Sequence, residues 1–133
     1  MYTFIKRAFM YPSFLTFDME TREISHERRL PTNTPLQALV TLNDPVYHEA
    51  AQALGQSMFA NIMAKDQSSA IRYGFKKVVS REPDANELKR LEIALYEISK
   101  DIKDSDLAPN LRVGAKWTAM ASVLLNLDIA LTR

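Results

Sequence analysis

The fold is decided in the stretch Arg28-Arg29-Leu30-Pro31-Thr32-Asn33-Thr34-Pro35-Leu36-Gln37-Ala38-Leu39-Val40-Thr41-Leu42-Asn43-Asp44-Pro45. Thr34 suits a helix N-cap, and Pro35 suits the first helical position, where no backbone N–H is needed. Gln37 lies three residues after Thr34, the spacing at which its side chain accepts the N–H of the cap residue and completes a capping box. Nine residues later the sequence Asn-Asp-Pro repeats the arrangement of a polar acceptor followed by proline. The stretch therefore predicts a short helix from Pro35 that leads at once into a longer one.

The chain after this stretch has the three- and four-residue apolar spacing of helices, and no strand-like alternation competes with it. Asp66 is expected to cap one helix, and Asp84 with Glu87 forms another capping box. Gly55, inside a predicted helix, permits a close contact between helices. We expect helices over residues 45–63, 67–80 and 85–102, a polar linker over 103–109, and one last helix with the apolar stripe Val113, Trp117, Met120, Leu124, Leu127 and Leu131.

The part of the chain before the stretch is predicted to be mostly irregular. A short helix over residues 2–9 should end at Pro12, and residues 13–29 show no sustained period. In that loop we expect three apolar side chains to anchor it to the helices: Phe14, Leu15 and Phe17. The fold class predicted is all-α: a single domain, residues 1–133, with an irregular segment over 1–33 and a small bundle of about five helices over 34–133.

Four apolar residues near the start of the chain predict a contact. They are expected to pack near Trp117, or to form an interface with an upstream domain or with a second copy; they are Tyr2, Phe4, Ile5 and Phe9.

Composition excludes several classes of protein. The 133 residues are 47% hydrophobic and 25% charged, which is typical of a globular domain. The formal net charge of +1 lacks the basic excess of a nucleic-acid-binding module. Without cysteine the chain holds no disulfide, no thiolate metal site and no haem-attachment motif. The most apolar run, residues 120–131, is too short to span a bilayer and contains Asp128, so no direct membrane insertion is expected.

The stretch from Arg28 to Pro45 also resembles the signature of a known bacterial family. Its pattern Arg-Arg-x-x-Thr-Asn-Thr-Pro-Leu-Gln-Ala-Leu-x-x-Leu-Asn-Asp-Pro is similar to that of the C-terminal domain of unknown function (PSD-type domain) found with planctomycete-type cytochrome C domains. The same family is indicated by Tyr2 to Arg7, Phe17-Asp18, Arg22-Glu23, Trp117 and Leu124 to Leu127, Asn126 included. Two positions depart from the family: Ser25 stands where a cysteine is frequent, which argues against a thiol role there, and Glu20 stands where a proline is usual.

The resemblance implies a setting but no reaction. It implies a C-terminal part of a larger exported protein, periplasmic or on the cell surface, with the upstream domains of the parent protein as partners and a homo-oligomer as a further option. Haem would belong only to an upstream domain that this chain lacks, and no cofactor is expected within the chain itself.

Arg28, Arg29 and Asn33 are the candidate binding residues. Two arginines beside a helix start could hold a carboxylate, sulfate or phosphate, since the guanidinium group and the free N–H groups after Thr34 both favour anions. The alternative is structural: the same side chains would tie the irregular segment to the bundle, where buried loop backbone needs hydrogen-bond partners. In that case an acid such as Asp18, Glu23 or Asp44 should pair with an arginine.

The sequence identifies no catalytic residue and no metal site. The two histidines, His26 and His48, have no partner at metal-ligand spacing. An acid pair could serve glycoside hydrolysis, but nothing fixes the separation of the candidates Asp18, Glu20, Glu23 and Glu27. Ser25 next to His26 is adjacency and not a catalytic triad. We therefore expect a structural or interaction domain, the motif residues being Thr34, Pro35, Gln37, Asn43, Asp44, Pro45, Trp117 and Asn126; the alternative is a ligand-binding or hydrolytic domain for an anionic or carbohydrate-like substrate near residues 28–45.

Overall fold

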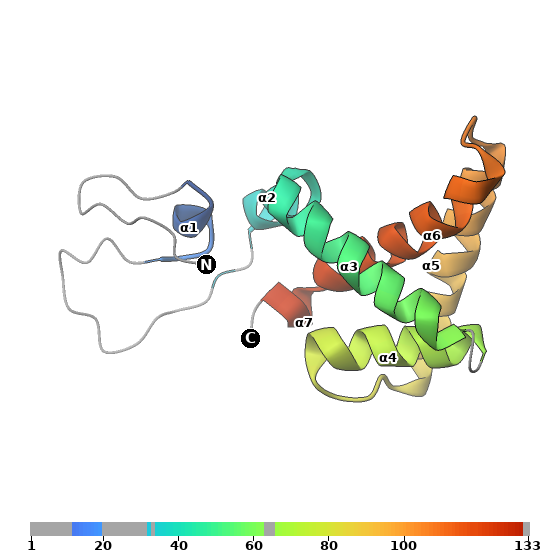
Figure 1. Ribbon diagram of the computed structural model, residues 1–133. Helices are drawn as coiled ribbons and strands as arrows, with labels where there is room; N and C mark the ends of the chain where they lie inside the picture. Colours follow the sequence, from blue (N-terminus) through green and yellow to red (C-terminus); the bar gives the residue numbers. More distant parts are fainter. Residues whose placement is uncertain (1–11, 20–31, 33, 63–65, 132–133) are drawn as a thin grey trace.

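The computed structural model describes residues 12–19, 32, 34–62 and 66–131 of the chain. These residues form helices and, within the described ranges, no strand. The all-α prediction is confirmed. The helices are α1 (Pro12–Thr16), α2 (Pro35–Asn43), α3 (Pro45–Ile62), α4 (Gln67–Val79), α5 (Ala85–Asp104), α6 (Pro109–Leu125) and α7 (Asp128–Leu131) (Figure 1).

The helix starts follow the predicted caps. At α2 the Thr34 hydroxyl accepts the Gln37 N–H at 3.4 Å, and Gln37 Oε1 accepts the Thr34 N–H at 3.2 Å. At α4 the Asp66 carboxylate accepts the Ser69 N–H at 3.1 Å. At α5 Glu87 Oε2 accepts the Asp84 N–H at 2.7 Å. Local hydrogen bonding therefore places each of these boundaries, as capping rules require.

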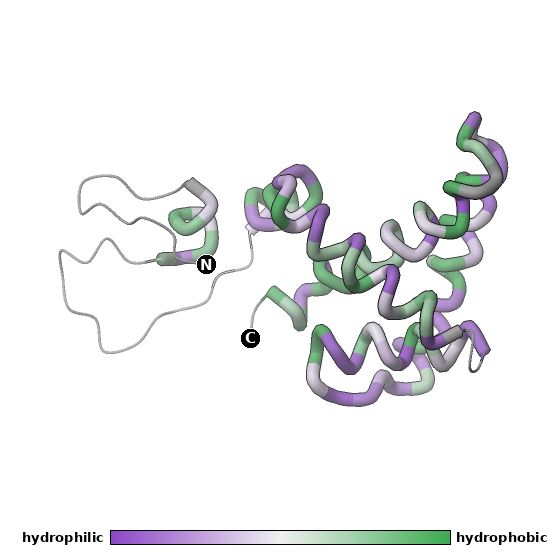
Figure 2. Tube along the Cα trace, viewed as in Figure 1, coloured by the Kyte–Doolittle hydropathy of each residue, from purple (hydrophilic) through white to green (hydrophobic). Residues whose placement is uncertain are grey.

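The core lies where α3 crosses α6, with α4 and α5 packed against the pair (Figure 1). Its buried side chains come from these four helices: Ala51, Met58, Ala70, Ile71, Phe75, Val79, Leu88, Leu91, Leu95, Trp117, Met120, Ala121 and Leu124. Figure 2 shows hydrophobic and hydrophilic residues alternating along α3 to α6, as expected for helices with one face inside. Trp117, one of the predicted motif residues, is part of this core.

Gly55 sets the distance between α3 and α6. A Cβ atom at this position would lie 2.8 Å from the backbone carbonyl of Trp117 and 2.8 Å from the Thr118 nitrogen. Backbone cannot yield as a side chain can, so the two helices meet this closely only because the residue is glycine. The predicted close contact is confirmed.

The C-terminal prediction was wrong in one respect. A single last helix was expected through Leu131, but α6 ends at Leu125 and the separate turn α7 begins at Asp128. Asn126 is the C-cap, and its backbone N–H donates to the Ser122 carbonyl at 3.1 Å. Leu127 still packs against the core. The apolar spacing therefore continues across the end of α6, so the spacing alone does not show that the helix ends there. Val113, expected in the buried stripe, is exposed although it lies on the same side of α6 as Trp117, because it is one turn closer to the start of the helix, ahead of the first core residue.

Two smaller corrections concern helix ends. Pro12 begins α1, so the expected irregular segment contains one helical turn. α5 continues to Asp104, two residues beyond the prediction, which shortens the linker to α6. The helix predicted over residues 2–9 lies outside the described residues.

Candidate functional site

The side chain of Gln37 is the centre of a hydrogen-bond cluster at the start of α2. It is 1% exposed, and its Nε2 donates to the Thr16 carbonyl at 3.0 Å. Because Oε1 accepts the Thr34 N–H, both ends of the buried amide have partners. Gln37 therefore joins α1 to α2 in addition to capping α2.

Asp18 completes this cluster from the other side. Its Oδ2 accepts the Thr32 N–H at 2.8 Å and the Thr32 hydroxyl at 2.8 Å, and Gln37 Nε2 lies 3.4 Å away. The pKa of Asp18 is lowered, mainly by the backbone hydrogen bond from Thr32 and then by the Thr32 hydroxyl. Its backbone is left-handed, with φ of 56°, which an aspartate tolerates better than most residues. The Asp18 charge is thus held by neutral donors within the described residues.

Asp44 has a double role at the junction of α2 and α3. Its Oδ1 accepts the Val46 N–H at 2.9 Å, which caps α3 as the Asn-Asp-Pro sequence predicted. Its Oδ2 accepts the Ser13 hydroxyl at 3.1 Å, which fixes the start of α1 beside the end of α2. Asn43, by contrast, points back along α2, where Nδ2 donates to the Leu39 carbonyl at 2.8 Å.

Thr41 ties α2 to the C-terminal end of α6. The hydroxyl lies 2.9 Å from the Ala38 carbonyl and 2.9 Å from Asn126 Oδ1, and it is 6% exposed. The predicted motif residue Asn126 therefore has a defined partner. Thr41 was missed by the sequence reasoning, although its spacing of four from Gln37 places both on one side of the helix.

Helix α2 is turned with its polar side inward. Its buried residues are Gln37 and Thr41, whereas three leucines on the opposite side are 55%, 57% and 56% exposed: Leu36, Leu39 and Leu42. With 3.6 residues per turn, the centre of this leucine set lies half a turn from the buried pair. We call Leu36, Leu39 and Leu42 the outer face of α2.

The candidate binding residues Arg28, Arg29 and Asn33 lie outside the described residues, so the choice between anion binding and a structural role stays a prediction. The same holds for Glu20, Glu23, Ser25, His26 and Glu27. Of the expected arginine partners, Asp18 is held by Thr32 and Gln37, and Asp44 by Ser13 and the Val46 N–H. Thr32 and Ser13 were not singled out by the sequence reasoning.

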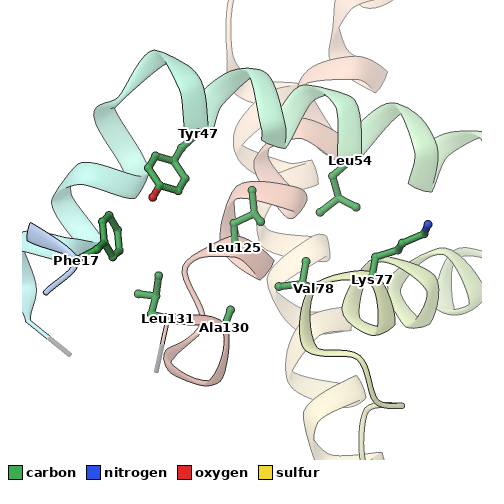
Figure 3. A pocket seen from close by; sticks show the side chains of 8 residues that line it. All are labelled: Phe17, Tyr47, Leu54, Lys77, Val78, Leu125, Ala130 and Leu131. Atoms are coloured by element: carbon green, nitrogen blue, oxygen red, sulfur yellow. The ribbon is translucent and has the colours of Figure 1, made fainter. Parts of the chain in front are cut away.

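An apolar pocket of about 550 Å³ lies between α3, α4 and the C-terminal turn (Figure 3). The rings of Phe17 and Tyr47 form one end, with centroids 5.8 Å apart, so Phe17 does anchor its segment to a helix. Leu125, Ala130 and Leu131 line the pocket further along. Burial, followed by the nearby Asp44 charge, raises the pKa of Tyr47 and keeps its hydroxyl protonated. The pocket offers apolar contact but no nucleophile with a base.

A second hollow, of about 980 Å³, lies along the α3–α6 crossing, where His48 and Gln52 approach within 3.1 Å. In the described part of the chain, no three His, Asp or Glu side chains come together as a metal site would require. The expectation of a metal-free, cofactor-free chain stays a prediction. None of the described helices has both the length and the apolar character needed to cross a lipid bilayer.

Comparison with known proteins gives one match. The family model PSD1, described as a protein of unknown function (DUF1553), matches residues 1–95, which include the whole Arg28–Pro45 stretch. No curated protein and no solved structure matches the chain. The match covers well over half of the sequence and agrees with the resemblance seen in the stretch. The chain therefore belongs to the PSD1 family of proteins of unknown function.

Proposed function

We propose that this chain is a structural and interaction domain of a larger exported protein, and that the outer face of α2 is its contact surface. The observation that carries the proposal is the inverted orientation of α2: Gln37 and Thr41 are buried while Leu36, Leu39 and Leu42 are exposed. The exported setting and the upstream domains as partners come from the family resemblance and belong to the proposal.

The polar residues of α2 support a structural role because they are used internally. Gln37 bonds to Thr16 and Thr34, and Thr41 to Asn126. Among the described residues no buried side-chain nitrogen or oxygen lacks a partner, so the buried polar groups of α2 are already used within the domain.

The outer face of α2 supports an interaction role because its exposed leucines have no charged side chain of the same helix beside them. The nine residues of α2 include no charged side chain. The exposed Ile93 of α5 provides a contrast, since Lys89 and Glu92 lie beside it around a shallow surface hollow. Contiguous exposed apolar patches, unlike single exposed apolar residues, are a recognised mark of interaction sites.

Because these 133 residues contain no cysteine, a thiol introduced among them can be followed by mapping the labelled peptides of the full parent protein. Leu39→Cys and the control Ile93→Cys place a thiol at positions that are 57% and 59% exposed in the domain. We expect the L39C thiol to react about tenfold more slowly than the I93C thiol, because a covering contact must open before the reagent enters. Equal rates in the parent protein would show an uncovered face and overturn the proposal.

The alternative, an anionic or carbohydrate-like ligand near residues 28–45, makes a different prediction. A ligand site there would show as stabilisation by the added anion or sugar, with equal labelling of the two thiols.

A further inference from the structure

We infer that a hollow between α4, α5 and α6 binds a zwitterionic α-amino acid with an aliphatic side chain. These three helices pack against one another in pairs (Figure 1). The hollow among them has a volume of about 480 Å³, and a carboxylate and an ammonium group both line it. The site lies away from α2, so the inference goes beyond the proposed interaction role and does not rest on it.

Glu92 of α5 gives the hollow its negative group. Its Oε1 accepts the Ser68 hydroxyl at 2.5 Å, which joins α5 to the first turn of α4. Its Oε2 has no hydrogen-bond partner among the described residues. Two turns further along α5, the Ser99 hydroxyl donates to the Leu95 carbonyl at 2.6 Å, so its oxygen can still accept a bond. This side of the hollow therefore offers acceptors, which an ammonium group requires.

Lys116 of α6 gives the hollow its positive group. Its ammonium group lies 5.5 Å from the centre of the Trp117 ring and makes no ion pair with another described residue. Burial, followed by the nearby charge of Lys103, lowers the pKa of Lys116. Both effects disfavour the charged form of the amine, and a bound carboxylate would offset them.

Glu92 and Lys116 line the same hollow, yet they form no ion pair with each other. A charge that is partly withdrawn from water is costly unless it is paired. A ligand that carries both an ammonium and a carboxylate group satisfies the two side chains at once, since its ammonium binds Glu92 and Ser99 while its carboxylate binds Lys116. A ligand with a single charge leaves one of the two side chains unpaired. The charges therefore favour a zwitterion over a simple anion or cation.

The remaining lining residues favour an aliphatic side chain on this ligand. Ile71 and Leu95 are buried and present apolar surface to the hollow, whereas Tyr96 is exposed at its rim. The volume lies within the range of about 300–1,000 Å³ that is usual for small-molecule sites. An amino acid such as leucine matches this combination of an apolar base and two opposite charges.

Three ligands that differ only in their charged groups test the inference on the 133-residue chain. They are L-leucine, 4-methylpentanoate, which lacks its amino group, and 3-methylbutylamine, which lacks its carboxylate. NMR titration of the isotope-labelled chain measures each affinity and shows which residues respond. We expect L-leucine to shift the resonances of residues around the hollow, and each single-charge analogue to bind about tenfold more weakly or worse, because hydrogen bonds to charged groups are strong enough for such a change.

Two variants with matched controls test the side chains. Glu92→Gln and Lys116→Met should each weaken the binding of L-leucine about tenfold. The controls Glu97→Gln and Lys100→Met remove the same charges from exposed positions of α5 that do not line the hollow, and they should bind like the unsubstituted chain.

Three results would overturn the inference. One is that 4-methylpentanoate or 3-methylbutylamine binds as tightly as L-leucine, because the hollow would then recognise a single charge. The second is that L-leucine shifts no resonance around the hollow up to millimolar concentrations. The third is that folded variants at Glu92 and Lys116 bind like their controls. The comparison of the three ligands needs only the unsubstituted chain, so it holds even if a variant fails to fold. None of these results affects the thiol test of the outer face of α2.

Discussion

The hydroxyl of Thr41 and the amide oxygen of Asn126 lie 2.9 Å apart although 85 residues separate them in the chain. This contact joins the family stretch to the end of α6 at a buried position. The contact lies at the break between α6 and α7. Asn126, which caps the end of α6, therefore also binds Thr41 on the buried side of α2.

Thr41→Val should lower the free energy of unfolding by about 1–2 kcal/mol, because the Asn126 amide loses a buried partner while the shape of residue 41 is kept. A double-mutant cycle with Asn126→Ala should give a coupling of about 1 kcal/mol in chemical denaturation. Additive effects would show that the two groups do not interact.

Thr34→Ala should cost about 1 kcal/mol, since the first turn of α2 loses a cap while the Gln37 side chain keeps its bond to the residue 34 N–H. Ser57→Ala is a suitable control, because Ser57 is exposed in the middle of α3, where its hydroxyl only bonds back to Ala53. Urea titration should separate the two variants, and an unchanged midpoint for Thr34→Ala would contradict the capping box.

Gly55→Ala and Gly114→Ala should change stability in opposite directions. At Gly55 a methyl group meets the backbone of Trp117 and Thr118, and such overpacking typically costs about 1–3 kcal/mol. At Gly114 the added carbon would meet nothing within 4 Å beyond its chain neighbours and the backbone of α6, so alanine should gain about 0.5–1 kcal/mol from its higher helix propensity. If both variants had higher melting temperatures than the unsubstituted chain, the close α3–α6 contact would be refuted.

The ion pair between Arg81 and Glu87 predicts a dependence of stability on acid. Arg81 Nη2 lies 2.6 Å from Glu87 Oε1, and this bond, followed by the Asp84 N–H, lowers the pKa of Glu87 from 4.5 to about 2. Because the pKa of Glu87 is lower in the folded chain than in the unfolded one, its ionised carboxylate stabilises the fold at pH values above about 4.5. This stabilisation is lost as the pH falls from about 4.5 to about 2.

Glu87→Gln isolates this charge because glutamine can still cap α5. The variant should be less stable than the parent chain at neutral pH, and the difference should vanish toward pH 2. Glu97→Gln, at an exposed position of the same helix, serves as control. A difference that persisted unchanged below pH 2 would exclude the ionised form of Glu87 as its cause.

Arg28→Ala and Arg29→Ala distinguish a structural arginine from one that binds an anion. We expect one of them to destabilise the fold by about 3–5 kcal/mol, the cost of leaving a buried charge without its partner. Melting curves with and without sulfate provide the measurement. If both variants melt like the unsubstituted chain and only the unsubstituted chain gains stability from sulfate, the arginines bind an anion.

The helix starts could be predicted because capping depends on neighbouring residues: Thr34 with Gln37, Asp66 with Ser69, and Asp84 with Glu87. The orientation of α2 could not, since a rule that buries apolar residues places Leu39 inside and Gln37 outside. The partners that reverse this order, Thr16 and Asn126, are distant in sequence. The break at Asn126 was hidden for a similar reason, because the apolar spacing continues from Leu124 to Leu127.

The inverted α2 also bears on the path by which the chain folds. Collapse driven by apolar burial alone favours the opposite rotation of this helix, with its leucines against α3 and α6. The native rotation is selected by directional hydrogen bonds to Gln37 and Thr41, which reward only the correct alignment. The two main stabilising forces therefore favour different rotations of this one short helix, which is a local frustration of the kind that natural sequences mostly avoid.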